Sequence, residues 1–120
     1  MAATLSASRD DTLYEPQGSE EHNNGAGEWF FVGQAGGRDV RRSLIGFDIA
    51  AGVRDGSTVV RAFLKLNMSR TIADDSEIRM HRVLSDWQEG QGIGFGNEGS
   101  GDAAAADDVS WTHRVFDTID

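Results

Sequence analysis

Two carboxylates flank a tryptophan in the segment Asp86-Trp87-Gln88-Glu89, which is the arrangement in this chain closest to the acid pair of a glycoside hydrolase. The sequence does not set the distance between Asp86 and Glu89 in space, and a chain with 20 acidic residues contains such pairs by chance. We therefore interpret the pair as part of a solvated turn. No nucleophile elbow and no His-Glu-x-x-His motif occurs in the sequence. No reaction can be assigned, and we expect a protein that is not an enzyme.

Histidine and glycine motifs add no further chemistry. The three histidines, His22, His81 and His113, lack metal-ligand spacing, and the chain has no cysteine to join them or to form a disulfide. The glycine pattern at 94–99 matches a dinucleotide fingerprint, but small and acidic residues follow it where a helix is required. We interpret 94–99 as a flexible loop.

Oxygen ligands suited to calcium occur in two places. Asn23, Asn24 and Glu28 belong to one long polar stretch, and Asp48 lies near the end of 41–49, a segment with the pattern of a strand. Amide and carboxylate oxygens are the ligands that calcium prefers, although the ordered spacing of an EF-hand loop is not present. Asn24, Glu28 and Asp48 form the hypothetical metal set, with calcium as the only cofactor considered.

Basic residues fall on expected strands of an otherwise acidic chain. If Arg42 shares a sheet face with Arg61 and Lys65, the three side chains form a strip suited to a carboxylated polymer. The alternative is ordinary cross-strand pairing of these cations with Asp and Glu.

Aromatic residues supply the second candidate feature for binding. A pyranose ring packs its C–H face on an aromatic ring, and Trp87 is the aromatic candidate that joins the basic strip as a ligand-binding residue. The alternative is that the tryptophans close the core, as they do in most small domains. The aromatic residues considered are Tyr14, Trp29, Trp87 and Trp111.

The composition limits the class of protein. A chain of 120 residues forms one domain or part of one. Its net charge of −9 argues against nucleic acid as a partner, because nucleic-acid binders need a clustered positive surface. No apolar run is long enough for membrane insertion, and residues 1–8 lack the basic start and apolar centre of a signal peptide. We interpret 1–8 as a flexible lead-in and 9–120 as the folded module.

Apolar residues alternate at a period of two, the pattern of strands with one buried face, and no helical period persists. The clearest strands are 41–49 and 58–68, the latter with Val60, Leu64 and Met68 on its inward face. We expect further strands at 28–33, 77–84 and 109–116, a short one beginning at Leu13 at a sheet edge, and long loops at 15–27 and 90–101. About five or six strands predict an all-β sandwich or barrel.

Several segments form a pattern by their order along the chain. The central part is Arg-Arg-Ser-Leu-Ile-Gly-Phe-Asp-Ile at 41–49, followed by Ala-Phe-Leu-Lys-Leu at 62–66. The other segments are Asp-Thr-Leu-Tyr at 11–14, Asn24-Gly25 with Gly27 before an apolar run ending in Val32-Gly33, Asp86-Trp87 with Glu89-Gly90, Ala104-Ala105 and Ser110-Trp111. In this order they resemble the DNRLRE domain, a group that overlaps the disaggregatase-related modules and carbohydrate-binding module family 96.

The resemblance implies an antiparallel β-sandwich of jelly-roll type that lacks its C-terminal strands, because family members continue past the point where this chain ends. It implies a non-catalytic carbohydrate-binding module that binds polysaccharide, including acidic polysaccharide, within a longer secreted or surface protein whose other domains are its neighbours. The alternative is a structural spacer or adhesion module without a small ligand. A polysaccharide lyase or hydrolase fragment ranks last.

Overall fold

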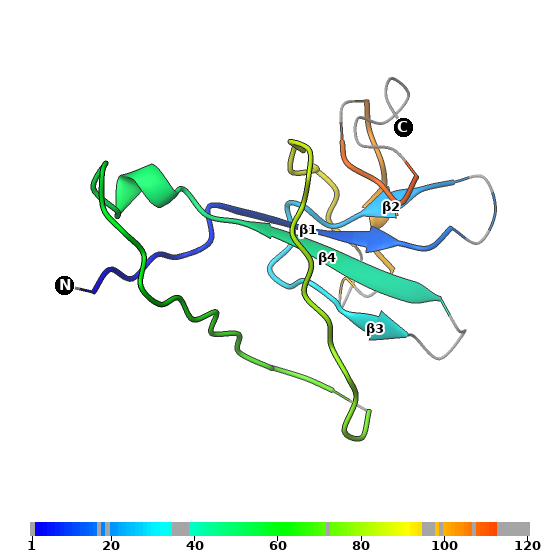
Figure 1. Ribbon diagram of the computed structural model, residues 1–120. Helices are drawn as coiled ribbons and strands as arrows, with labels where there is room; N and C mark the ends of the chain where they lie inside the picture. Colours follow the sequence, from blue (N-terminus) through cyan, green and yellow to red (C-terminus); the bar gives the residue numbers. More distant parts are fainter. Residues whose placement is uncertain are drawn as a thin grey trace.

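The computed structural model describes residues 2–16, 18, 20–34, 39–71, 73–94, 98, 100–106 and 108–112. Among the described residues, the regular structure is one antiparallel sheet of five strands in the order β3-β4-β1-β2-β5 (Figure 1). The same residues include one 3₁₀ turn, η1, at Ile49–Ala51. The expectation of an all-β, antiparallel protein is confirmed. The strands are β1 (Arg9–Tyr14), β2 (His22–Asn23), β3 (Gly33–Gln34), β4 (Val40–Gly46) and β5 (Asp102–Ala103).

The antiparallel pair of β1 and β4 forms the middle of the sheet. Their register runs from Arg9 opposite Gly46 to Tyr14 opposite Arg41. The predicted strand at 41–49 is confirmed as far as Gly46, after which the chain turns into η1. The predicted strand at Leu13 is also confirmed, but its position at a sheet edge is wrong. It lies in the middle strand, where β4 pairs with one side and β2 with the other.

Each face of this pair carries a different set of side chains. Residues directly opposite each other in an antiparallel ladder point to the same face, and faces alternate along a strand. One face therefore carries Arg9, Asp11 and Leu13 from β1 with Arg42 and Leu44 from β4. The other face carries Thr12, Tyr14, Arg41, Ser43 and Ile45.

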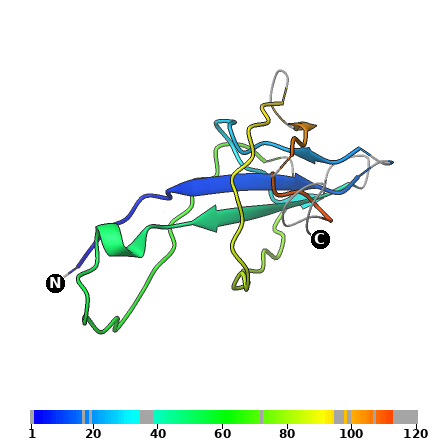
Figure 2. The same cartoon turned by 90° about the horizontal axis from the view of Figure 1, so that it is seen from above.

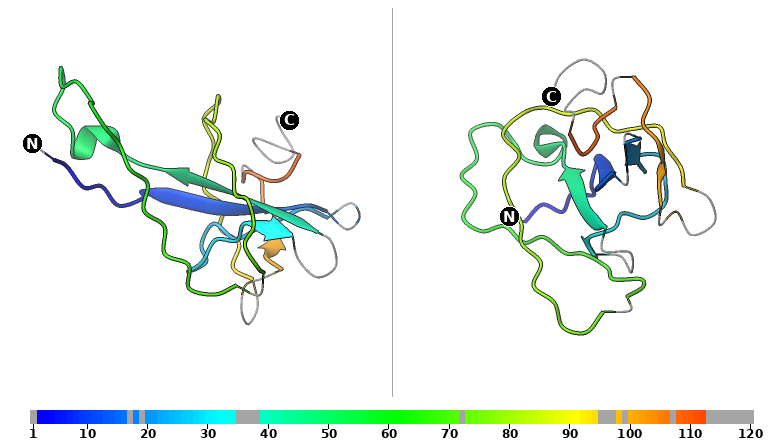
Figure 3. Two further views of the ribbon diagram at one scale, coloured as in Figure 1. Left: turned by 60° about the horizontal axis from the view of Figure 1, so that its bottom comes forward. Right: turned by 90° about the vertical axis from the view of Figure 1, so that its right-hand side faces the viewer.

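The strands predicted at 58–68 and 77–84 are not formed in the described part of these segments. Every described residue from 54 to 86 is exposed, including Val60 at 91% and Phe63 at 85%. The green segment after η1 runs outside the sheet in Figure 1 and in the right-hand view of Figure 3. The period-two alternation of apolar residues in these segments indicates that they are compatible with a β-strand. It does not determine whether a neighbouring strand is present to pair with them.

Polar side chains occupy most of the described interior. The buried apolar residues are Tyr14, Trp87 and Val109, whereas Asp11, Thr12, Asn23, Asn24 and Asp108 are almost fully buried. Of the predicted strand at 28–33, only its end enters β3. Of the segment predicted at 109–116, Val109 and Ser110 are buried, residues 111 and 112 form a bend, and 113–116 lie outside the described residues. No helix among the described residues has the length and apolar character to cross a membrane.

Candidate functional site

A shallow groove of about 330 Å³ lies against the face of β1 and β4 that carries Leu13 and Leu44. Trp87 and Trp111 both line it, together with Val83. The segment before Trp87 crosses the direction of β1 and β4 in Figures 1 and 2. Two strands and two later segments therefore build one groove.

An arginine from the same sheet face stacks on each tryptophan. The guanidinium carbon of Arg9 lies 4.4 Å from the centroid of the Trp87 ring, and that of Arg42 lies 4.6 Å from the centroid of the Trp111 ring. At these distances the cation is attracted to the negative face of the ring. The strand register explains the pairing, because Arg9 and Arg42 point to the same side of the sheet.

Arg9 is fully engaged within the protein. Its Nη2 forms an ion pair with Asp86 Oδ1 at 3.0 Å, and its Nη1 donates a hydrogen bond to the carbonyl oxygen of Trp87. The Trp87 side chain under it is only 6% exposed. Arg9 and Trp87 thus fasten the later segment to β1.

Arg42 differs from Arg9 because its donors are uncommitted. It is the exposed residue of β4, and within the described chain its side chain forms no ion pair or hydrogen bond. Trp111 beneath it is half-buried. A guanidinium held flat on a ring keeps its planar N–H edge open, which suits a bidentate carboxylate.

The predicted binding residues are divided by the structure. Arg42 and Trp87 belong to the groove region, Trp87 as a lining residue and Arg42 through its stack on Trp111. Arg61 and Lys65 are exposed in the segment outside the sheet and do not line the groove. The expected basic strip on one sheet face therefore does not form, because 58–68 is not a strand of this sheet. The sequence analysis did not identify Arg9 as a residue of this site. Its position two residues before Asp11 on β1 places both side chains on the same face of the sheet.

The hypothetical calcium ligands have different surroundings. Asn24 is fully buried, with its Oδ1 accepting from the Gly94 N–H and its Nδ2 donating to the Trp29 carbonyl. Glu28 and Asp48 are exposed, and the Asp48 side chain makes no capping bond to η1. No group of three or more His, Asp or Glu side chains in the described ranges is placed to hold a metal ion. The calcium set stays a prediction.

Three buried polar side chains hold a glycine-rich segment that the sequence marked only as a loop. The Gly90 N–H donates to Asp11 Oδ2 at 2.9 Å, Gly92 to Asn23 Oδ1 at 3.1 Å and Gly94 to Asn24 Oδ1 at 3.0 Å. Gly94 and Glu98, the described residues of 94–99, belong to no helix or strand, as the interpretation of a loop expects, and both are buried. The alternate glycines at 90, 92 and 94 are the sequence signal for this close approach.

Asp11 is the centre of this polar cluster. Its Oδ1 accepts from the backbone N–H groups of Thr12 and Asn24, at 2.7 and 3.0 Å. Burial raises the pKa of Asp11 to about 6 although these N–H groups and that of Gly90 favour the charged form. Asp108, which accepts from Asn23 Nδ2 at 2.8 Å, raises the pKa of Asp11 further through its own charge.

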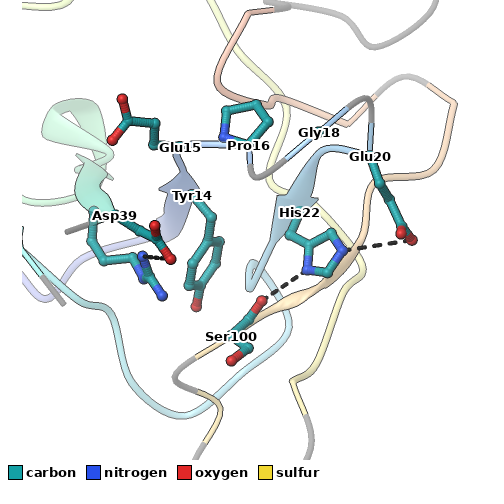
Figure 4. A pocket seen from close by; sticks show the side chains of 9 residues that line it. Tyr14, Glu15, Pro16, Gly18, Glu20, His22, Asp39 and Ser100 are labelled. Atoms are coloured by element: carbon teal, nitrogen blue, oxygen red, sulfur yellow. Dashed lines mark hydrogen bonds and ion pairs between the residues drawn. The ribbon is translucent and has the colours of Figure 1, made fainter. Parts of the chain in front are cut away.

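A second, polar pocket of about 460 Å³ opens on the other face, beside Tyr14 and Arg41 (Figure 4). His22 Nδ1 lies 2.8 Å from the Ser100 carbonyl oxygen, and its Nε2 lies 3.5 Å from Glu20. Arg41 stacks on the Tyr14 ring at 4.8 Å and lies 3.7 Å from Asp39. The described charged side chains that line this pocket are thus engaged with other groups of the protein.

No family model, curated protein or solved structure matches the chain. The resemblance to the DNRLRE domain therefore rests on the residues that carry it and stays a prediction.

Proposed function

We propose that this chain is a non-catalytic carbohydrate-binding module that binds an acidic polysaccharide at the groove beside Arg42 and Trp111. The observation that carries the proposal is the open guanidinium of Arg42, stacked on a half-buried tryptophan that lines the groove. A ring face suits the C–H face of a sugar, and a guanidinium edge suits its carboxylate. Both are offered at one place.

Because the chain is acidic overall, it can bind a polyanion only where a cation is held at the binding site. A protein of net charge −9 repels a polyanion at long range, so binding needs a local cation that is held in place. Arg42 has this property because the Trp111 ring orients it. Arg61 and Lys65 are exposed cations without such support among the described residues.

The two acid candidates support the proposal that the module is non-catalytic. Asp86 is paired with Arg9 at 3.0 Å, and Glu89 Oε1 accepts a hydrogen bond from the Asp10 N–H at 2.7 Å. Each carboxylate thus fastens its segment to β1. We propose further that the sheet is one layer of a jelly-roll sandwich in a longer surface or secreted protein, in keeping with the family that the sequence resembles.

A structural spacer or adhesion module is the second candidate, and the burial of Trp87 favours it. Trp87 is 6% exposed beneath Arg9, so this ring closes the interior and offers little surface to a sugar. Trp111 is the ring on which the two candidates differ.

The test is a thermal melt of the full chain with and without alginate, a polymer of carboxylated sugars. A ligand that binds only the native state raises its stability by about 2.7 kcal/mol at a hundredfold excess over its dissociation constant. We expect alginate to raise the melting temperature of the wild-type chain and to leave that of Arg42→Ala and Trp111→Ala unchanged.

The matched control is Arg54→Ala, which removes an exposed arginine that follows η1 and lies away from the groove lining. We expect this variant to keep the full shift with alginate. Equal loss of the shift in Arg54→Ala and Arg42→Ala would show nonspecific charge binding. A wild-type melt that neither alginate nor a neutral glucan shifts would favour the spacer.

A further inference from the structure

The segment 58–68 has an apolar face that is exposed along its length. Val60, Leu64, Leu66 and Met68 recur at even positions and are 91%, 37%, 51% and 69% exposed, and Phe63 on the alternate face is 85% exposed. Single exposed apolar residues are ordinary at protein surfaces, but a contiguous run of this kind marks an interaction surface.

The backbone of the same segment also lacks partners. In the ranges 58–71 and 73–85, no backbone–backbone hydrogen bond joins a described residue to another part of the described chain. A row of open N–H and C=O groups with alternating apolar side chains is a template for strand pairing. The segment therefore has both properties of a strand whose neighbour comes from outside this copy.

The exposed area is large enough for a stable dimer. The chain exposes 9434 Å², whereas a compact folded protein of 13.0 kDa exposes about 6,300 Å². Its radius of gyration of 15.6 Å likewise exceeds the roughly 14 Å expected for a compact domain of 120 residues. A standard interface buries about 800 Å² on each partner, so the excess can supply it.

Charge indicates what covers the segment. Residues 58–82 contain five basic and three acidic residues, whereas the rest of the chain contains six basic and 17 acidic residues. A basic, apolar segment and a strongly acidic body are complementary. Two 58–68 segments paired centrally with each other would instead place Arg61 opposite Lys65, and like charges directly opposite each other are unfavourable.

We propose that the partner is a second copy of this chain, and that segment 58–68 of each copy pairs as a strand against the acidic, sheet-bearing body of the other. The two contacts are equivalent in such a two-fold dimer, so the assembly closes at two copies. Val60, Leu64 and Met68 supply the apolar contact, and Arg61 and Lys65 supply the charge that sets its orientation. This dimer is independent of the proposed carbohydrate groove, which neither cation lines.

The test measures the molar mass of the full chain by light scattering over a range of concentrations and salt. We expect a dimer that weakens as salt rises, because salt screens the exposed charges. Val60→Asp and the double variant Arg61→Glu/Lys65→Glu should each raise the dissociation constant at least tenfold. The matched controls are Ile49→Asp and Arg54→Glu, exposed residues outside the segment, which should leave it unchanged.

Hydrogen exchange of the same samples gives a second readout that does not depend on a variant folding. We expect the amides of 58–68 to be slowed at concentrations where the dimer forms and to exchange freely on dilution. A wild-type chain that stays monomeric at all concentrations would overturn the proposal. A dimer whose 58–68 amides exchange freely, or whose stability Val60→Asp leaves unchanged, would overturn it as well.

Discussion

The Asp11 carboxylate accepts a hydrogen bond from the backbone N–H of Gly90 at 2.9 Å and so joins residues that are 79 positions apart in the chain. Asn23 and Asn24 repeat the contact with Gly92 and Gly94. Because few apolar side chains are buried among the described residues, these bonds take a large part in holding the later segments to the sheet. An unsatisfied buried group costs about 1–3 kcal/mol, so each is sensitive to substitution.

Stability should fall as pH rises from 4 to 6. Burial raises the pKa of Asp11 from 3.8 to about 6, so the native state binds more protons than the unfolded state in this interval. The contribution is fully present below pH 4 and is lost as pH passes 6, with a size of at most about 3 kcal/mol. Asp10, whose pKa burial and Glu89 also raise, adds in the same direction.

Urea unfolding at several pH values measures this slope. Asp11→Asn should reduce it and leave the smaller part due to Asp10. A slope that is unchanged in Asp11→Asn would show that Asp11 is not the titrating group.

Gly92→Ala should destabilise the protein by about 1–3 kcal/mol, as forced overpacking does. A Cβ at this position would lie 2.5 Å from Asn23 Oδ1 and 2.9 Å from the Asn23 backbone oxygen, so the backbone must move. Chemical denaturation measures the change. Gly18→Ala is the control, because a Cβ there meets nothing within 4 Å. Equal stability of the two variants would contradict the close approach.

Glu98→Gln should cost about 1–3 kcal/mol, because an amide has one acceptor oxygen where the carboxylate has two. Glu98 is 5% exposed, and its two carboxylate oxygens accept from the N–H groups of Glu28 and Trp29 at 2.9 and 3.2 Å. The backbone of Glu98 has a φ of 63°. Glutamate and glutamine tolerate this φ equally, so the change in stability reports the side-chain hydrogen bonds alone.

The melting temperature of Glu98→Gln compared with that of Glu20→Gln measures this effect. Glu20 is exposed, so its substitution should have little effect. A Glu98→Gln variant as stable as Glu20→Gln would show that the two N–H donors find other acceptors.

The sequence by itself determined the class of the fold and its best strand. Alternation over 41–49 predicted β4, because side-chain direction in a strand follows from local backbone geometry. The lack of a helical period excluded a helical protein for the same local reason.

Tertiary structure decided which residues are brought together. The same alternation at 58–68 predicted a strand that this sheet does not contain, because a strand also needs a neighbour, which local sequence cannot specify. The stacking of Arg9 on Trp87 and of Arg42 on Trp111 joins residues far apart in the chain. The bonds from Asp11, Asn23 and Asn24 to Gly90, Gly92 and Gly94 depend on chain crossings that set the distance between them. The number of residues between two positions in the sequence does not determine that distance.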